Sequence, residues 1–261
     1  MSASLRIYVC GQLAIESTNH QILERDFPAR QGRMMWCFLV VHRQRQAGKL
    51  ELADALWGDD IPDGWEPTLN AVVSRLRGML RPIQDQSREV LLVSDHGRYQ
   101  LSLPAGAFVD RERARSGLHN AETALKSGDL DGALSEARVA MEIAARGFMG
   151  GEEAPWIEGQ RRLLRDVRAH AWECTIEAEL RRGNFQRAER ECEDLIGIDP
   201  LNEKAYRLQM QASVAMGNRS GAVLAMERCR GALRAAAGIE PSPETSDLFA
   251  QLTGRPSQRM S

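Results

Sequence analysis

Three segments in the second half of the chain share one pattern: a glycine, directly followed by an aspartate or asparagine, and an alanine five positions after the glycine. They begin at Gly128, Gly183 and Gly217, and the last two glycines lie 34 positions apart. Glycine permits the left-handed backbone that ends a helix, aspartate and asparagine cap the next helix, and a small alanine lets two helices cross closely. A pattern repeated at this interval predicts an array of paired helices, each packed on its neighbours.

The interval is the period of tetratricopeptide repeats, so we expect an all-helical domain of that type. Pro200 lies where such a repeat ends its second helix. The expected N-caps are Asp129, Asn184 and Asn218, and the expected helix crossings are at Ala133, Ala188 and Ala222. Gly128 and Gly183 are 55 positions apart, which is longer than the repeat and indicates an insertion. The inserted segment is residues 148–166.

The first part of the chain, up to about residue 107, has a different periodicity. Alternating apolar residues in 5–16 and 21–27 predict paired strands, and apolar residues at helical spacing predict helices in 32–46, 50–57 and 67–82. We expect these helices to end at Gly48, Gly58 and Pro82, because glycine supports a left-handed stop and proline cannot continue a helix.

Two apolar strands in 90–103, around the turn residues Asp95, His96 and Gly97, then predict a hairpin. Strands, three helices and a hairpin, in this order, form the layout of a winged helix-turn-helix. The expected fold is an α+β winged-helix domain over 1–106, followed by the all-α helical-repeat domain over 107–261, mainly α overall.

The third predicted helix carries the candidate functional residues. Its apolar stripe consists of Leu69, Val72, Val73, Leu76 and Leu80. The flanks are polar and contain no acidic residue between Thr68 and Gln84. Such a helix either reads the major groove of DNA or is merely solvated, and the helix pattern alone does not decide between them. Trp57 and Trp65 fit packing in the core of the helix-turn-helix better than stacking on a base.

Composition narrows the classes of function. The formal net charge of −2 excludes a protein that coats nucleic acid by bulk attraction, so any DNA contact must be local. The five cysteines are scattered without a CxxC pair, which indicates buried small residues rather than disulfides or a zinc cluster. No apolar run is long enough to span a membrane, and no signal peptide is evident, so we expect a cytoplasmic protein.

Enzymatic signatures are absent from the sequence. No phosphate-binding loop, nucleophile elbow or zinc-protease motif occurs, and the glycines of 150–153 are not a dinucleotide fingerprint. His170 and Cys174 stand four positions apart but lack a third ligand nearby, so packing explains them better than a metal. We therefore expect no catalytic residue, no metal and no cofactor.

Two stretches of the chain resemble a known family. Residues 51–80, ELADALWGDDIPDGWEPTLNAVVSRLRGML, resemble the winged helix of response regulators, and HGRYQLSLP resembles the wing that closes it. FMGGEEAPWIEGQRRLL and the later AAAGIEPSPETSDLFAQL resemble the bacterial transcriptional activator domain of the antibiotic regulatory protein (SARP) activators. The chain as a whole resembles a small stand-alone member of that family, and we expect no receiver, ATPase or sensor domain to be attached.

The resemblance implies a set of contacts. The family's recognition-helix contacts to double-stranded promoter DNA fall on Thr68, Asn70, Ser74, Arg75 and Arg77. The wing would contact DNA through His96 or Arg98, whereas Asp95 would repel a phosphate unless it caps the turn. The resemblance also implies recruitment of RNA polymerase holoenzyme through its sigma factor, and homodimer formation on promoter direct repeats. Trp156 and Glu158 match family positions, and we interpret them as structural.

These observations support one main hypothesis and one rival. The main hypothesis is a sequence-specific DNA-binding transcription activator, with Arg75 reading a base and Arg77 contacting a base or a phosphate. The rival is a non-enzymatic adaptor whose winged helix binds protein, which the nearly balanced charge of the first domain favours. Small-molecule sensing between the helical repeats is compatible with the main hypothesis.

Overall fold

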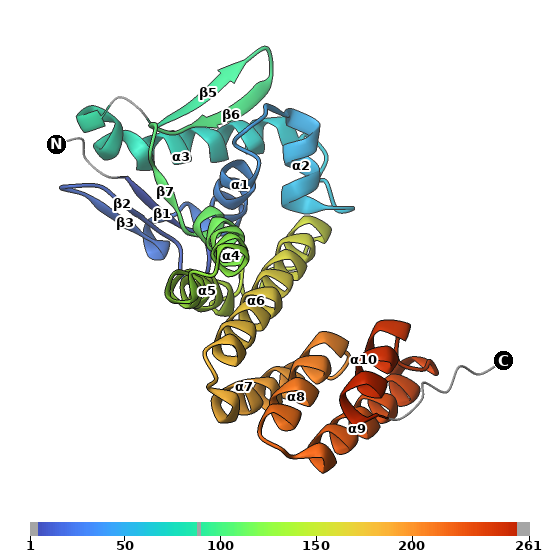
Figure 1. Ribbon diagram of the computed structural model, residues 1–261. Helices are drawn as coiled ribbons and strands as arrows, with labels where there is room; N and C mark the ends of the chain where they lie inside the picture. The colour runs from blue at the N-terminus through green and yellow to red at the C-terminus, as the bar shows by residue number, and fades with distance from the viewer. Residues whose placement is uncertain (1–4, 88–89, 255–261) are drawn as a thin grey trace. The chain divides into compact units, whose positions relative to one another are not determined.

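The computed structural model describes residues 5–87 and 90–254, and Figure 1 shows the course of the chain. The chain divides into two compact units, residues 1–113 with 143–164, and residues 114–142 with 165–261. The predicted boundary between 106 and 107 follows the change in periodicity along the sequence. The compact units instead place most of the inserted segment 148–166 with the first unit, which the sequence pattern did not indicate.

A small sheet in the first unit contains β1 (Arg6–Tyr8), β2 (Ala14–Glu16), β3 (Gln21–Leu23) and β7 (Phe108–Val109), in the order β3-β2-β1-β7. The predicted pairing of the first strands is confirmed, because Ile7 lies opposite Ile15, and Ile15 lies opposite Ile22. These three isoleucines are buried and hold the strands on the core. The two-residue β7 pairs in parallel with β1 and was too short for the sequence pattern to predict.

Three helices follow, α1 (Ala29–Val41), α2 (Lys49–Trp57) and α3 (Trp65–Ser87), after a short 3-10 turn at Glu24–Asp26. Gly58 ends α2 with a φ of 59°, as predicted. The prediction for Gly48 is wrong, because Ala47 and Gly48 form the extended strand β4 (Ala47–Gly48) and Gly48 is the N-cap of α2. Helix α1 ends earlier, at Val41.

The predicted ends of the third helix are also wrong. Helix α3 begins at Trp65 and continues through Pro82 to Ser87. Proline forfeits one helical hydrogen bond and strains the preceding turn. Here Leu80 and Ile83 are buried on either side of Pro82 and keep both turns on the core, so tertiary packing outweighs the local preference.

The predicted hairpin is confirmed. It consists of β5 (Leu91–Asp95) and β6 (Arg98–Ser102), in a three-stranded sheet of order β4-β6-β5. Both turn residues have positive φ, 46° at His96 and 76° at Gly97, as a two-residue type I′ turn requires. The first unit therefore has the element order of a winged helix-turn-helix, with the hairpin as its wing.

The remaining elements are helices: α4 (Asp110–Ser127), α5 (Leu130–Ala145), α6 (Pro155–Arg181), α7 (Phe185–Ile198), α8 (Glu203–Ala215), α9 (Arg219–Ala237) and α10 (Pro243–Thr253). The fold class is as expected, a mixed α/β region followed by many helices (Figure 1). In the part of the chain that the structure describes, no helix combines the length and apolar character needed to cross a membrane.

The repeat pattern maps onto the helix turns almost as predicted. Gly128, Gly183 and Gly217 have φ of 82°, 80° and 79°. Ala133, Ala188 and Ala222 are fully buried, as residues at close helix crossings would be. Asp129 and Asn218 accept hydrogen bonds from the backbone N–H of Gly132 and Gly221, at 2.9 Å each.

Asn184 is an exception to the predicted N-caps. Its side chain makes no cap hydrogen bond and instead donates to Glu179 Oε2 at 2.6 Å. At Asp129 and Asn218, the two predicted caps that form, the third residue of the helix is a glycine, and a Cβ there would clash with the capping side chain. At α7 this position is Arg187, and its guanidinium joins the same buried Glu179 at 3.2 Å.

Candidate nucleic-acid interface

Helix α3 presents a polar surface because its apolar stripe holds the opposite side on the core. All five residues of the predicted stripe are buried: Leu69, Val72, Val73, Leu76 and Leu80. Of the five predicted contact residues on this helix, four are exposed: Thr68, Asn70, Ser74 and Arg75. The fifth, Arg77, is only partly exposed.

Arg77 points to the wing. Its Nε and Nη2 both donate to the backbone carbonyl of Leu92, at 3.2 and 3.0 Å. Its Nη2 also donates to Ser94 Oγ at 2.8 Å. The expected role of Arg77 in contacting a base or phosphate therefore competes with an interaction that already occupies two of its three nitrogens.

Asn70 is also linked to the wing. The hydroxyl of Tyr99, a buried residue of β6, donates to Asn70 Oδ1 at 3.3 Å. The amide oxygen of Asn70 is thus engaged, although the residue as a whole is exposed. An asparagine reads adenine with both amide atoms, so this interaction also bears on the expected role.

Two arginines of α3 keep their charge available. Arg75 and Arg81 are exposed, and the structure records no ion pair for either among the side chains that it describes, those of 5–83 and 90–254. Glu66, the nearest acid on the N-terminal side of both arginines, is paired with Lys49 at 2.6 Å. Arg81 lies on the flank that sequence analysis identified but was not predicted as a contact. Together with Ser74, Gly78 and Ser94 it lines a groove between α3 and β5.

The tip of the wing is open to solvent. The His96 side chain is 93% exposed, and its Nδ1 lies 2.7 Å from Asp95 Oδ1. Asp95 is therefore directed to His96 within the turn. Arg98 pairs in register with Asp95 across the turn and is exposed. The geometry makes Arg98 the more available cation of the wing.

The inserted segment with Trp156 has a structural position. Trp156 donates from Nε1 to the carbonyl of Ala55 in α2, and Arg161 donates to the carbonyls of Phe148, Met149 and Glu152. Glu158 forms an ion pair with Arg161. These contacts agree with the structural interpretation of Trp156 and Glu158. Trp57 and Trp65 are each partly buried.

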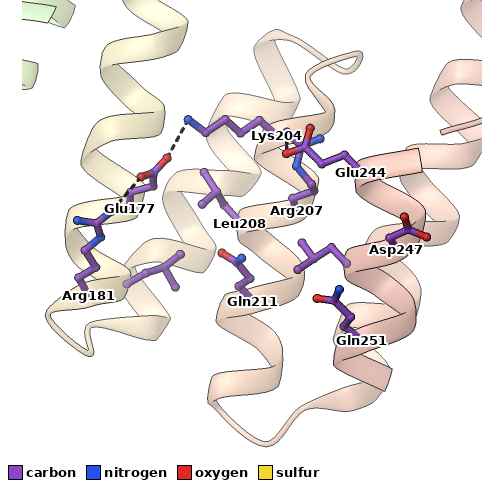
Figure 2. A pocket seen from close by; sticks show the side chains of 11 residues that line it. Glu177, Arg181, Lys204, Arg207, Leu208, Gln211, Glu244, Asp247 and Gln251 are labelled. Atoms are coloured by element: carbon purple, nitrogen blue, oxygen red, sulfur yellow. Dashed lines mark ion pairs between the residues drawn. The ribbon is translucent and has the colours of Figure 1, made fainter. Parts of the chain in front are cut away.

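A groove in the second unit runs between α6, α8 and α10 (Figure 2). Its charged side chains neutralise one another: Lys204 lies 2.8 Å and Arg181 3.7 Å from Glu177, and Arg207 lies 3.3 Å from Glu244. Each helix also contributes one leucine, Leu180, Leu208 and Leu248. Such a lining suits a peptide segment with apolar side chains better than a small charged ligand.

Within the described residues, no group of three or more histidine, cysteine, aspartate or glutamate side chains has the arrangement of a metal site. His170 is exposed and Cys174 is buried. Burial raises the pKa of the Cys174 thiol to about 12, which disfavours the thiolate that a metal would need.

Comparison with known proteins provides independent information. Residues 109–253, more than half of the chain, match the family model of the bacterial transcriptional activator domain. The regulatory protein AfsR of Streptomyces coelicolor is 29% identical over 218 residues, which cover 84% of this chain and 21% of that protein. The transcriptional regulatory protein EmbR of Mycobacterium tuberculosis is 28% identical over 219 residues, covering 81% of this chain and 54% of EmbR.

The fold is similar to that of a solved structure, M. tuberculosis EmbR in complex with a low-affinity phosphopeptide. The TM-score is 0.82 at 22% identity, and the match covers 97% of this chain and 66% of that one. The chain thus spans between about a fifth and a half of the length of these curated relatives.

Proposed function

The chain belongs to the bacterial transcriptional activator domain family, and on this premise we propose that it is a sequence-specific DNA-binding transcription activator. Its winged helix reads direct repeats in a promoter, and its helical domain recruits RNA polymerase through the sigma factor. The relatives AfsR and EmbR are named as regulatory proteins, which supports the class.

The observation that carries this proposal is the outer face of α3. Arg75 and Arg81 project from a helix whose other side is fixed in the core, and the stretch from Thr68 to Gln84 contains no acidic residue. A protein of nearly neutral net charge needs such a local cationic surface to bind a duplex.

The side chains suggest a division of roles. Arg75 has a planar fork that matches the O6 and N7 acceptors of guanine, so we assign it base readout. Thr68 and Ser74 have short hydroxyl side chains that suit phosphate contacts. Arg98, at the tip of the wing, would contact the neighbouring backbone or minor groove.

The helical domain would supply the polymerase contact. The groove between α6, α8 and α10 offers three leucines and two exposed amides, Gln211 and Gln251, to a peptide segment. A Gln211→Lys, Gln251→Lys double variant changes the charge of this groove without altering its packing. We expect lower promoter-dependent transcription with purified holoenzyme and unchanged promoter binding. Equal transcription by the wild-type chain and the double variant would exclude this groove as the site that contacts RNA polymerase.

The DNA-binding proposal is tested by selection. The full chain is incubated with a pool of random duplexes, and the retained sequences are determined at several salt concentrations. A DNA reader selects a repeated motif and loses affinity steeply as salt rises, because counterions are released from the phosphates. An adaptor whose winged helix binds protein would retain no duplex even at low salt.

A further inference from the structure

The wing is attached to α3 at two points, through Arg77 and Asn70. We propose that these two residues position the wing relative to the outward cations of α3, rather than contact DNA themselves. This inference rests on the proposed DNA-binding function. It departs from the expectation drawn from the family resemblance, which placed both residues in direct contact with the duplex.

The Arg77 attachment fixes β5 in more than one direction. Two nitrogens of the guanidinium share the Leu92 carbonyl, and one of them also reaches the Ser94 hydroxyl. A planar fork that binds two residues, two positions apart on one strand, restrains both the distance and the rotation of that strand. Lysine has a single nitrogen on a flexible stem and would not reproduce this geometry.

The strand concerned needs such an attachment. β5 is at the edge of the three-stranded sheet β4-β6-β5, so only β6 pairs with it among the described residues. An edge strand has a hydrogen-bonded neighbour on one side only, so its other side lacks a backbone partner. Arg77 provides the missing restraint from the helix.

The Asn70 attachment holds the other strand. Asn70 precedes Arg77 by two helical turns, or about 10 Å along the helix axis. It receives its hydrogen bond from Tyr99 of β6, and Tyr99 lies opposite Ser94 in the hairpin register. Two attachments at different heights on α3, one to each strand, prevent the hairpin from rotating about either of them.

The consequence concerns affinity. Arg75 and Arg81 lie on α3, whereas Arg98 lies on the wing. When the wing is fixed, contact of α3 with DNA brings Arg98 to the duplex without a further loss of freedom. When the wing is loose, the same contacts form at a higher entropic cost. The loss is then equal for every DNA sequence, because no base contact has been removed.

The test changes Arg77 at one attachment and each of the two partners, Asn70 and Tyr99, at the other. The variants Arg77→Lys, Arg77→Ala, Asn70→Ala and Tyr99→Phe are made in the full chain, with Arg81→Ala as the control on the same helix. Tyr99→Phe removes the hydroxyl that binds Asn70 while leaving Asn70 in place. The probes are a duplex selected by the wild-type chain from random sequence and a scrambled duplex of the same composition.

We expect both Arg77 variants to weaken binding to the two duplexes by the same factor, about tenfold, as the cost of a lost preorganisation. The slope of log affinity against log salt stays at the wild-type value, and hydrogen exchange in 91–95 becomes faster in the absence of DNA. Asn70→Ala and Tyr99→Phe reduce the affinity for DNA by the same factor, which is smaller than that of the Arg77 variants. Arg81→Ala leaves hydrogen exchange unchanged.

Several results would overturn the proposal. A salt slope lowered by about one in Arg77→Ala would identify a phosphate contact, and relaxed discrimination at one base pair would identify base readout. Unequal effects of Asn70→Ala and Tyr99→Phe would assign Asn70 to DNA. A lower melting temperature with unchanged DNA affinity would leave Arg77 a purely structural role. If the wild-type chain selects no duplex at all, the proposed function fails and the inference fails with it.

Discussion

The indole of Trp156 donates from Nε1 to the backbone carbonyl of Ala55 across 3.0 Å, and so joins the start of α6 to the last turn of α2. Carbonyls in the last turn of a helix lack helical partners, and this one is satisfied by the side chain. The Trp156 ring also meets Phe38 and Phe148 edge-on, with centroids 5.3 and 5.9 Å apart. The inserted segment is thereby packed against the helix-turn-helix within one compact unit.

Truncation of Trp156 should therefore destabilise the first unit. We expect Trp156→Ala to lower the free energy of unfolding by about 3–5 kcal/mol, as for a large aromatic truncated in a core. Trp156→Phe, which keeps an aromatic ring but loses the indole N–H that donates to Ala55, should cost about 1 kcal/mol for the lost hydrogen bond. Urea unfolding followed by circular dichroism measures both. Equal midpoints for Trp156→Ala and wild type would show that the segment adds no stability.

Two glycines of α9 provide a matched pair. A Cβ on Gly221 would lie 2.7 Å from Asn218 Nδ2 and 2.9 Å from Ser213 Oγ, whereas a Cβ on Gly231 would meet nothing within 4 Å. Gly231→Ala should stabilise the protein by about 0.5–1 kcal/mol through helix propensity. Gly221→Ala should destabilise it by about 1 kcal/mol, because the lost cap outweighs the same propensity gain. Thermal unfolding of both variants checks the opposite signs, and a stabilising Gly221→Ala would refute the role of the cap.

Because the thiols of Cys192 and Cys229 are buried, the protein should become less stable at alkaline pH. Burial raises the pKa of Cys192 from 9.0 to about 12 and that of Cys229 to about 11. The folded state therefore keeps its protons where the unfolded state loses them. The free energy of unfolding should fall as pH rises above 9, through the window up to about 12. Urea titrations across this range measure the slope, which should be shallower in Cys192→Ala. A slope identical to that of wild type would mean that this thiol ionises freely in the folded state.

The hydrogen bonds that hold the start of α10 to Glu203 in α8 should weaken at low pH. Glu203 in α8 accepts from the Ser242 backbone N–H at 2.9 Å and from its hydroxyl at 2.7 Å. Burial raises the pKa of Glu203, but hydrogen bonds from Thr245 and Ser242 outweigh it, so the pKa lies below its usual 4.5. The stabilisation is present above pH 4.5 and is lost as pH falls through the lowered pKa. The protection of 243–253 against hydrogen exchange, relative to the intrinsic rate at each pH, should fall over that range, and in Glu203→Gln it should already be low at neutral pH. Slow exchange in the variant would contradict this.

Much of the architecture could be predicted from the sequence because it depends on local periodicity. The buried stripe from Leu69 to Leu80 and the positive φ of Gly183 and Gly217 follow from helical spacing and from glycine's conformational freedom. Long-range packing explains most of the errors. Pro82 does not end α3 because buried neighbours hold the helix, and Gly48 is extended because its segment pairs with β6.

The candidate interface was predictable in position but not in detail. Sequence reasoning located the polar face of α3, and the exposed Arg75 lies on it. It could not predict that Arg77 binds Leu92, because the two residues belong to different elements and the bond is to a backbone carbonyl, which leaves no mark in the sequence. Nor could it predict that Tyr99 binds Asn70, because these two residues also belong to different elements.

The measurement that tests the account most directly is equilibrium binding of the wild-type chain and of Arg75→Ala to the duplex that the wild type selects, over a range of salt. The account predicts steep salt dependence for the wild type. For Arg75→Ala it predicts a loss of about 1–3 kcal/mol of discrimination at one base pair. Binding and discrimination unchanged in Arg75→Ala, or no duplex affinity of the wild type at low salt, would contradict it.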